Sequence, residues 1–323
     1  MKPAALIESP APAPLLENAT AKSRAPELSW RLTSTLHDLF DLTKARVSLL
    51  VLLTTLVGFV LSARQVGSGL ASWPLLITLL GTWLVASSAA VMNQLIEKDH
   101  DARMVRTRSR PLPAGRLAPY EALVLAIVLV LAGLGLLSTV QLAAAAVAAV
   151  TFLSYVFVYT PLKRITHLST VVGAIPGALP PLIGWVAAGG SLSGPAWTLF
   201  GIIFFWQLPH FLAIAWLYRE DYARGGFPML TVVDPSGGAT ARQVVSNSLA
   251  LLLVSLFPAL TGQTGVTYFW VALVLGVLFL ACAVWLALAR TRLAARVLLV
   301  GSIVYLPLLL IAMVLEPSWR GLF

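Results

Sequence analysis

Long apolar runs separated by short polar or charged stretches dominate the chain from about residue 46 onward. Each run approaches the roughly 20 residues that a helix needs to cross a bilayer. Only Ser138, Thr139 and Gln141 interrupt the apolar sequence between the third and fourth runs. The pattern predicts nine membrane-spanning segments, at residues 46–63, 72–95, 119–138, 141–160, 168–188, 196–217, 243–261, 268–289 and 296–315.

The composition excludes an ordinary soluble globular protein, because 59% of the 323 residues are hydrophobic and only 11% are charged. We therefore predict an all-α polytopic membrane protein, with about nine transmembrane helices around a central cavity open to the cytoplasmic face. The net charge of +9 does not indicate nucleic-acid binding, because the positive residues lie in the N-terminal tail and in short loops. Of the 22 Lys and Arg, only Arg64 and Arg320 fall on the opposite side, which predicts a cytoplasmic N-terminus and cytoplasmic charged loops.

The first 44 residues differ from the rest, since they are rich in proline and alanine at the start and contain no long apolar run. We expect residues 1–44 to be a cytoplasmic tail and residues 45–323 to be the intramembrane domain. Within the tail, residues 29–44 place leucines at helical spacing. A short amphipathic helix on the membrane surface and a poorly ordered lead-in both remain open.

The stretch from Asn93 to Pro113 carries the strongest chemical pattern. Asn93, Glu97 and Asp101 follow one another at intervals of four residues, so on a helix they form one stripe. Oxygen ligands of this kind suit Mg²⁺. Asp99 would lie about 160° around the helix from Glu97 and Asp101, which makes it the weakest candidate. A solvated network of ion pairs is the alternative interpretation.

Several cations follow this stripe or lie in other charged loops and could bind a diphosphate. Lys163 and Arg164 could instead be ordinary anchors at the membrane surface. Glu220 and Asp221 provide a second acidic pair, which could bind metal or form solvated ion pairs. The candidate diphosphate-binding residues are Arg103, Arg106, Arg110, Lys163, Arg164 and Arg219.

Two apolar segments contain further signals. The fifth segment includes Gly173, Pro176, Gly177 and Pro180, so it is a poor continuous helix and could line a cavity. The sixth segment contains His210, and a titratable group inside a membrane helix is a functional candidate. His210 could bind haem iron, transfer protons, or form a hydrogen bond with a neighbouring helix.

Carboxylates, Mg²⁺ and arginines together suit the departure of a diphosphate, while an apolar interior would shield an allylic carbocation from water. Three stretches carry a resemblance to the UbiA superfamily of intramembrane prenyltransferases, and within it to the haem O synthases (protohaem IX farnesyltransferases). They are NQLIEKDHDARMVRTRSRPLPAGRL, YTPLKRIT with GAIPGALPPLIGW, and FFWQLPHFLAIAWLYREDYARGGFPML. The superfamily's first acidic motif resembles N-x3-D-x3-D, but its middle position here is Glu97. The second acidic region is reduced to Glu220 and Asp221.

The resemblance implies a Mg²⁺-dependent reaction in which farnesyl diphosphate and haem b give haem O and diphosphate. It implies catalytic roles for Asn93, Glu97, Asp101 and Lys163, and metal binding by Asn93, Glu97, Asp101, Glu220 and Asp221. It makes His210 a haem-binding candidate. The implied location is a bacterial cytoplasmic (inner) membrane, with a haem A-forming enzyme or terminal oxidase assembly as a partner. A prenyltransferase for a quinone precursor or another aromatic acceptor and a non-catalytic haem transporter remain alternatives.

Overall fold

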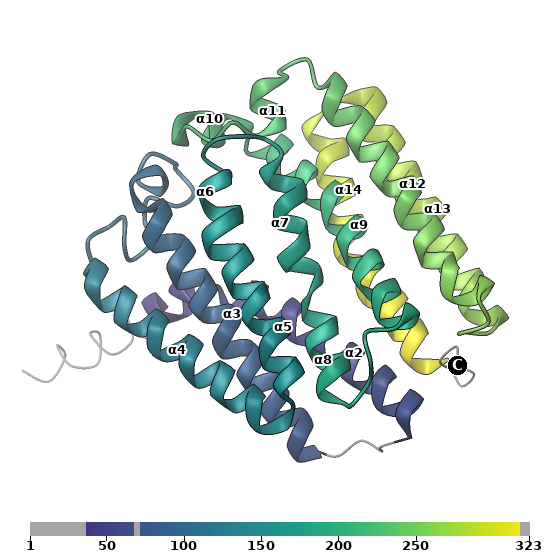
Figure 1. Ribbon diagram of the computed structural model, residues 1–323. Helices are drawn as coiled ribbons and strands as arrows, with labels where there is room; N and C mark the ends of the chain where they lie inside the picture. Colours follow the sequence, from purple (N-terminus) through teal and green to yellow (C-terminus); the bar gives the residue numbers. More distant parts are fainter. Residues whose placement is uncertain (1–36, 68–71, 317–323) are drawn as a thin grey trace, which may run out of the picture. The chain divides into compact units, whose positions relative to one another are not determined.

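The structure is a computed structural model that describes residues 37–67 and 72–316, without the side chains of residues 45 and 46. Every regular element in these ranges is helical (Figure 1). The helices are α2 (Ala45–Val66), α3 (Ser72–Asp101), α4 (Pro119–Val140), α5 (Leu142–Leu153), η1 (Ser154–Tyr159), α6 (Thr160–Leu162), α7 (Ser169–Ala178), α8 (Pro180–Ala187), α9 (Gly194–Leu217), α10 (Arg219–Gly225), α11 (Leu230–Val233), α12 (Gly238–Leu260), α13 (Val266–Ala289) and α14 (Arg292–Leu315).

Nine spans long and apolar enough to cross a membrane occur in the described part of the chain, which confirms the predicted number. The largest change at a boundary is in the second span, which runs from Ser72 to Asp101 instead of ending at residue 95. Helical geometry continues there because the polar residues of the stripe point into the protein. The whole stripe therefore belongs to one helix, α3.

Two spans depart from a regular α-helix. The fifth is broken at Leu179, between α7 and α8, and Pro180 begins the second piece, as the prolines and glycines predict. The fourth contains a six-residue π-helix, η1, which the sequence pattern does not predict. Such π-helical turns are rare and often lie at functional sites. Here η1 precedes Thr160 and Lys163, which both contact α3.

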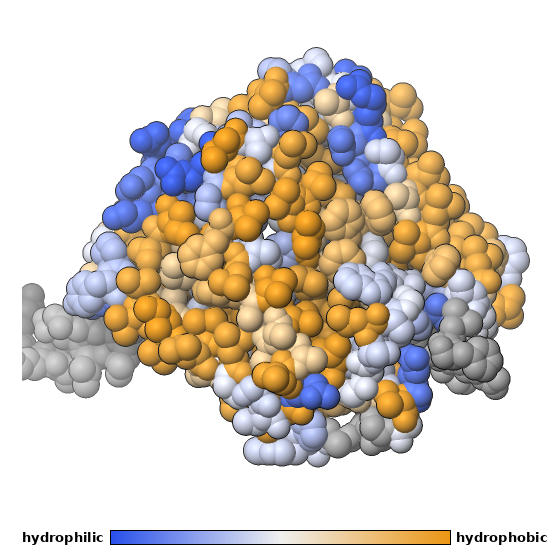
Figure 2. Space-filling view, viewed as in Figure 1, coloured by the Kyte–Doolittle hydropathy of each residue, from blue (hydrophilic) through white to orange (hydrophobic). Residues whose placement is uncertain are grey.

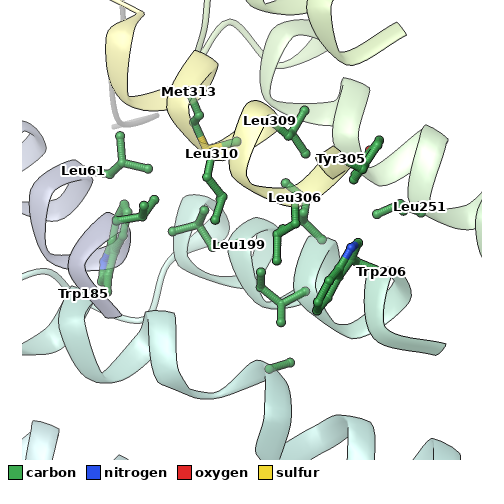
Figure 3. Close-up of a cluster of buried hydrophobic side chains, with 14 of the residues drawn as sticks. Leu61, Trp185, Leu199, Trp206, Leu251, Tyr305, Leu306, Leu309, Leu310 and Met313 are labelled. Carbon is green, nitrogen blue, oxygen red and sulfur yellow. The ribbon is translucent and has the colours of Figure 1, made fainter. Parts of the chain in front are cut away.

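The buried core lies where α14 packs against α9, with α2 and α8 beside it (Figure 3). Trp206 of α9 donates from its indole Nε1 to the backbone oxygen of Ser302 in α14 at 2.8 Å. Tyr305 of α14 is fully buried and forms a hydrogen bond with Ser255 of α12 at 2.8 Å. The polar end of each large aromatic side chain is thereby satisfied within the apolar core.

The outer surface is the reverse of a soluble protein's surface, because many large apolar side chains are exposed. Figure 2 shows these hydrophobic residues along the sides of the helices. Hydrophilic residues gather over α10, α11 and the segment between α3 and α4 (Figure 2). An apolar belt with a polar end is the arrangement expected of helices embedded in a bilayer. We call this polar end the charged end.

Residues 38–42, which belong to the predicted surface helix, are helical, while residues 29–36 lie outside the described part. Leu42 is buried in a small core with Val91 of α3 and Ala122 of α4. Gln94 of α3 donates to the backbone oxygens of Asp41 and Leu42 at 3.2 and 2.7 Å. The lead-in to α2 is therefore tied to α3 next to Asn93.

Helices α2 and α8 approach so closely that a glycine is required at the contact. A Cβ atom at Gly58 would lie 2.0 Å from the backbone oxygen of Pro181. Changing Gly58 to alanine should therefore lower the free energy of unfolding by about 1–3 kcal/mol, because one backbone has to move. Gly135 of α4 is the matched control, since no atom lies within 4 Å of its added Cβ. Equal melting temperatures of the two variants in detergent would contradict this packing argument.

Candidate active site at the charged end of α3

The predicted stripe forms in the structure. Asn93, Glu97 and Asp101 occupy the last turns of α3, and only 3%, 1% and 1% of their surface is exposed. Asp99 points outward and is exposed, as its position around the helix predicts. Two carboxylates and one amide are therefore held inside the protein, where an unpartnered polar group is costly.

Each member of the stripe contacts a side chain from another element. Lys44, just before α2, donates from Nζ to Asn93 Oδ1 at 2.7 Å. Lys163, just after α6, donates to Glu97 Oε2 at 2.9 Å. Two segments that are distant from α3 in the sequence thus reach its buried stripe.

Asp101 also contacts a cation from another segment, and Asn93 has a second hydrogen bond. Arg110 donates to Asp101 Oδ2 at 2.6 Å, from the segment between α3 and α4. Thr160 of α6 lies 3.3 Å from Asn93 Nδ2 and accepts from it. Cations therefore balance both carboxylates, so the site is close to electrically neutral as the structure shows it.

Glu97 retains unused bonding capacity. Its second oxygen, Oε1, is buried and has no hydrogen-bond partner in the described part of the chain. A buried carboxylate oxygen without a partner is unusual and suggests a missing ligand. Burial alone would lower the pKa of Lys163, but the charge and hydrogen bond of Glu97, together with Tyr222 and Tyr155, outweigh burial and raise this pKa. Lys163 therefore keeps its positive charge beside Glu97.

Lys44 behaves differently from Lys163. Burial and the nearby Arg110 guanidinium lower its pKa to about 7, although Glu97 acts in the opposite direction. Lys44 is consequently only partly charged at neutral pH. No feature of the sequence distinguished it from an ordinary positive anchor at the start of a span. Thr160 was likewise missed, because threonine is common in apolar helices.

The predicted diphosphate-binding residues fall into two groups. Arg110 and Lys163 contact the stripe directly. The other four arginines are exposed at the charged end. Two of these stack on aromatic rings, Arg106 on Tyr218 and Arg219 on Trp216, at 5.3 and 5.4 Å from the ring centroids. The exposed members are Arg103, Arg106, Arg164 and Arg219.

The two residues of the second acidic pair, Glu220 and Asp221, differ in burial. Asp221 of α10 is buried, and its two oxygens accept from the backbone N–H groups of Val105 and Arg106 at 3.1 and 3.2 Å. Arg224 donates to the same carboxylate at 2.5 Å. These donors outweigh burial, which acts in the opposite direction, and lower the Asp221 pKa. Glu220 is exposed.

Apolar contacts hold α10 and the following turn against the end of α3. Met104 packs in a small core with Tyr222, Phe227 and Met229. The Lys163 ammonium lies 4.4 Å from the centroid of the Phe227 ring. The two predicted acidic regions therefore meet at one site, although the acidic side chains of the second region do not contact the stripe.

His210 lies on the side of α9 that faces α14. Its Nδ1 is 2.7 Å from Ser302 Oγ, and its ring stacks on Trp206 with centroids 5.1 Å apart. Ser302 Oγ also donates to the backbone oxygen of Leu299 at 2.6 Å. Because a serine hydroxyl has one hydrogen, Ser302 must accept from His210 Nδ1–H. The lone pair of the His210 ring therefore resides on Nε2.

The described residues contain no group of three or more His, Cys, Asp and Glu side chains arranged to hold a metal ion. The stripe instead offers two carboxylates and an amide, a donor set of oxygens that suits a hard cation. The unpartnered Glu97 Oε1 is consistent with such a ligand. The residues present therefore fit Mg²⁺.

Solved structures with a similar fold include a digeranylgeranylglyceryl phosphate synthase and UbiA homologues. A digeranylgeranylglyceryl phosphate synthase has a TM-score of 0.71 at 17% identity, covering 88% of this chain and 98% of its own. A UbiA homologue from Archaeoglobus fulgidus, solved with GPP and Mg²⁺, has a TM-score of 0.61 at 14% identity, covering 85% and 99%. These likenesses establish a shared fold.

Sequence relatives are closer. Protoheme IX farnesyltransferase from Solibacter usitatus is 46% identical over 288 residues, covering 87% of this chain and 99% of that protein. The protein of the same name from Koribacter versatilis is 42% identical, covering 88% and 94%. The model of the UbiA prenyltransferase family matches residues 51–314. With its fold and its stripe at the end of α3, the chain belongs to the UbiA prenyltransferase family.

Proposed function

We propose that this protein transfers the farnesyl group of farnesyl diphosphate to a vinyl group of haem b, giving haem O and diphosphate. The relatives named protoheme IX farnesyltransferase support this assignment, at up to 46% identity over most of the chain. The observation in the molecule that carries it is the buried acidic stripe, each of whose carboxylates is paired with a cation. Such a site can accept a metal ion and an oxyanion together.

Asn93, Glu97 and Asp101 would hold Mg²⁺, which when bound neutralises charge on the diphosphate leaving group. The replacement of aspartate by Glu97 at the middle position places the carboxylate one methylene further from α3. This carboxylate accepts a hydrogen bond from Lys163, just after α6, at 2.9 Å. The metal role predicted for Glu220 and Asp221 stays a prediction, because the contacts of Asp221 are to Val105, Arg106 and Arg224.

Lys163 and Arg110 are the cations best placed to bind the diphosphate. Without substrate they compensate Glu97 and Asp101. When these two carboxylates bind a metal ion, the ammonium of Lys163 and the guanidinium of Arg110 can donate hydrogen bonds to phosphate oxygens instead. The exposed arginines of the charged end, including Arg103 and Arg164, would attract the anionic substrate from solution. Catalysis then rests on donors that stabilise the charge of the departing diphosphate.

Departure of the diphosphate leaves an allylic cation at farnesyl C1, which a vinyl carbon of haem b captures. Water adds to the resulting cation and loses a proton, which gives the hydroxyethylfarnesyl group of haem O. Water that reached the allylic farnesyl cation before haem b did would convert it to an alcohol. The rings of Tyr155 and Tyr159, 5.1 Å apart in η1 beside the stripe, contribute apolar surface that excludes it.

The distribution of Lys and Arg supports a cytoplasmic position for the charged end, and with it for the proposed active site. We propose a bacterial inner membrane as the location, because a lipid-soluble prenyl donor and haem both partition there. Haem O would pass to a haem A-forming enzyme or to a terminal oxidase assembly as downstream partner.

The decisive test is acceptor choice. Purified protein in vesicles with Mg²⁺ and labelled farnesyl diphosphate would receive haem b or 4-hydroxybenzoate, and the products would be identified by mass spectrometry. We expect label only in haem O. Label in 4-hydroxybenzoate would identify a prenyltransferase for aromatic acceptors, while no diphosphate release with either acceptor would overturn the enzymatic assignment.

The Nε2 lone pair of His210 makes it a candidate ligand of the haem iron. If it has this role, His210→Ala should weaken haem b binding by about tenfold or more and shift the haem absorption spectrum. Ser302→Ala should cause a smaller loss of haem affinity. This change removes the hydrogen bond that fixes the protonated ring nitrogen of His210, but it leaves the imidazole in place. Haem titrations followed by absorbance would measure both changes. Unchanged affinity and spectrum in His210→Ala would remove His210 from the haem site.

A further inference from the structure

A cavity lies at the charged end, and no residue of the stripe lines it. It has a volume of about 190 Å³ and is enclosed by the start of α7, the middle of α9, α11 and the first turns of α12. Its wall includes no residue of α3 or α6. The proposed reaction therefore assigns no role to it.

The polar part of the wall is basic. Arg242 of α12 and His167, just before α7, both line the cavity, and neither side chain has a hydrogen-bond or ion-pair partner in the described part of the chain. Thr170 of α7 is only 8% exposed, and its hydroxyl oxygen is buried without a partner. Since threonine in a helix has two accessible χ1 rotamers, this hydroxyl can turn towards a bound group. Three unused donors therefore surround one space.

Apart from the neutral Gln243, the remaining wall is apolar and continues onto the outer surface. Leu208 and Leu212 of α9 are buried at the back of the cavity. Leu168 and Val171 flank it and are 55% and 39% exposed, on the side that meets lipid. A molecule with an anionic head and an apolar tail would match this distribution, with its head inside and its tail along these side chains.

The volume of the cavity limits which amphipathic anions it can bind. Pockets that enclose a drug-sized ligand usually measure about 300–1,000 Å³, so 190 Å³ is too small for a porphyrin. A phosphate head whose acyl chains remain in the bilayer needs no larger space. Basic pockets between transmembrane helices near the membrane surface bind anionic lipid head groups. We propose that this cavity binds the phosphate of an anionic phospholipid, held by Arg242, His167 and Thr170.

The carboxylate of Asp234, just before α12, forms no ion pair with Arg242 or His167. Asp234 accepts from the backbone N–H of Ala239, in the first turn of α12, at 2.6 Å and from Ser236 Oγ. These hydrogen bonds lower its pKa, and it remains ionised at neutral pH. Arg242 thus faces the cavity with its guanidinium available for phosphate oxygens.

Native mass spectrometry of the purified full chain, exchanged into phosphatidylglycerol or phosphatidylcholine, tests the proposal. We expect retained phosphatidylglycerol in the natural protein. Arg242→Gln should reduce retention at least about fivefold, the factor that corresponds to about 1 kcal/mol per basic residue at a membrane surface. Thr170→Val should also reduce it, whereas Thr170→Ser should restore it because the hydroxyl remains. Arg292→Gln, an exposed arginine of the same end, is the matched control and should have no effect.

Three outcomes would overturn the proposal. They are equal retention of the two lipids, equal retention by Arg242→Gln and Arg292→Gln, and displacement of phosphatidylglycerol by stoichiometric haem b. Displacement by haem b would show that the cavity binds the propionate carboxylates of the haem and not a lipid phosphate. Melting temperatures of all variants separate loss of the site from loss of the fold. Farnesyl transfer is measured separately, so failure of this proposal leaves the proposed reaction untouched.

Discussion

Replacing Asp101 with asparagine should lower farnesyl transfer by at least about a hundredfold, the usual effect of removing one charge-stabilising group. The same change at Asp99 should keep activity within about twofold, as expected of an exposed position. Both residues lie on α3, two positions apart, but Asp101 is buried against Arg110 and Asp99 is exposed. The chemical change is identical, so the comparison isolates position on the helix.

The measurement is initial rate against Mg²⁺ concentration for both variants. If Asp101 binds the metal, Asp101→Asn should require more Mg²⁺, whereas Asp99→Asn should match the natural protein. Asp101→Glu, which keeps the charge, should recover part of the lost rate. Because Asp101→Asn also leaves Arg110 without its partner, melting temperatures must accompany the rates. Equal rates for the two asparagine variants would refute the role of the stripe.

Periodicity explains why this part of the site could be predicted. Residues four apart share one face of a helix, so the positions of Asn93, Glu97 and Asp101 follow from their spacing once α3 is helical. Burial of the stripe follows in the same way, because polar groups in a membrane helix turn inward. The number of spans and the break in the fifth follow from apolar length and from proline chemistry.

The partners of the stripe could not be predicted, because they depend on tertiary packing. Lys44 meets Asn93 across 49 positions of sequence, and Lys163 meets Glu97 across 66. Lys44 looks like an ordinary positive anchor in the sequence, and Lys163 was a candidate for binding the diphosphate, with nothing to indicate its contact with Glu97. The π-helix η1 has no recognisable sequence signature, yet it precedes the turn that carries Lys163.

Glu220 and Asp221 illustrate a different limit. The sequence left metal binding and solvated ion pairs open for this acidic pair, and the family resemblance implied one metal-binding role for both residues. Successive residues on a helix point about 100° apart, so Asp221 is buried while Glu220 is exposed. The buried carboxylate accepts backbone N–H groups from the segment that carries Arg103, Arg106 and Arg110. A contact between two irregular segments leaves no periodic trace in the sequence.

Asp221→Asn should therefore loosen the segment between α3 and α4, even without metal or substrate. The amide of asparagine accepts hydrogen bonds through its oxygen only. Its NH2 group would therefore face one of the two backbone N–H groups, of Val105 and Arg106, that now donate to Asp221. Losing hydrogen bonds to a charged group should raise the population of the open segment by about tenfold or more. Trypsin cleavage at the arginines of this segment, in metal-free protein, would measure that change.

Farnesyl transfer by Asp221→Asn should fall by about 10- to 100-fold, as for other groups that position catalytic residues. Glu220→Gln is the matched control, and both its cleavage and its rate should be unchanged. A metal ligand at position 221 predicts the opposite pattern, in which metal-free cleavage stays slow and only the Mg²⁺ requirement rises. The two measurements thus separate a clamp on Val105 and Arg106 from a direct metal contact. Because Arg110 reaches Asp101 from this same segment, a loosened clamp would disturb the stripe without touching it.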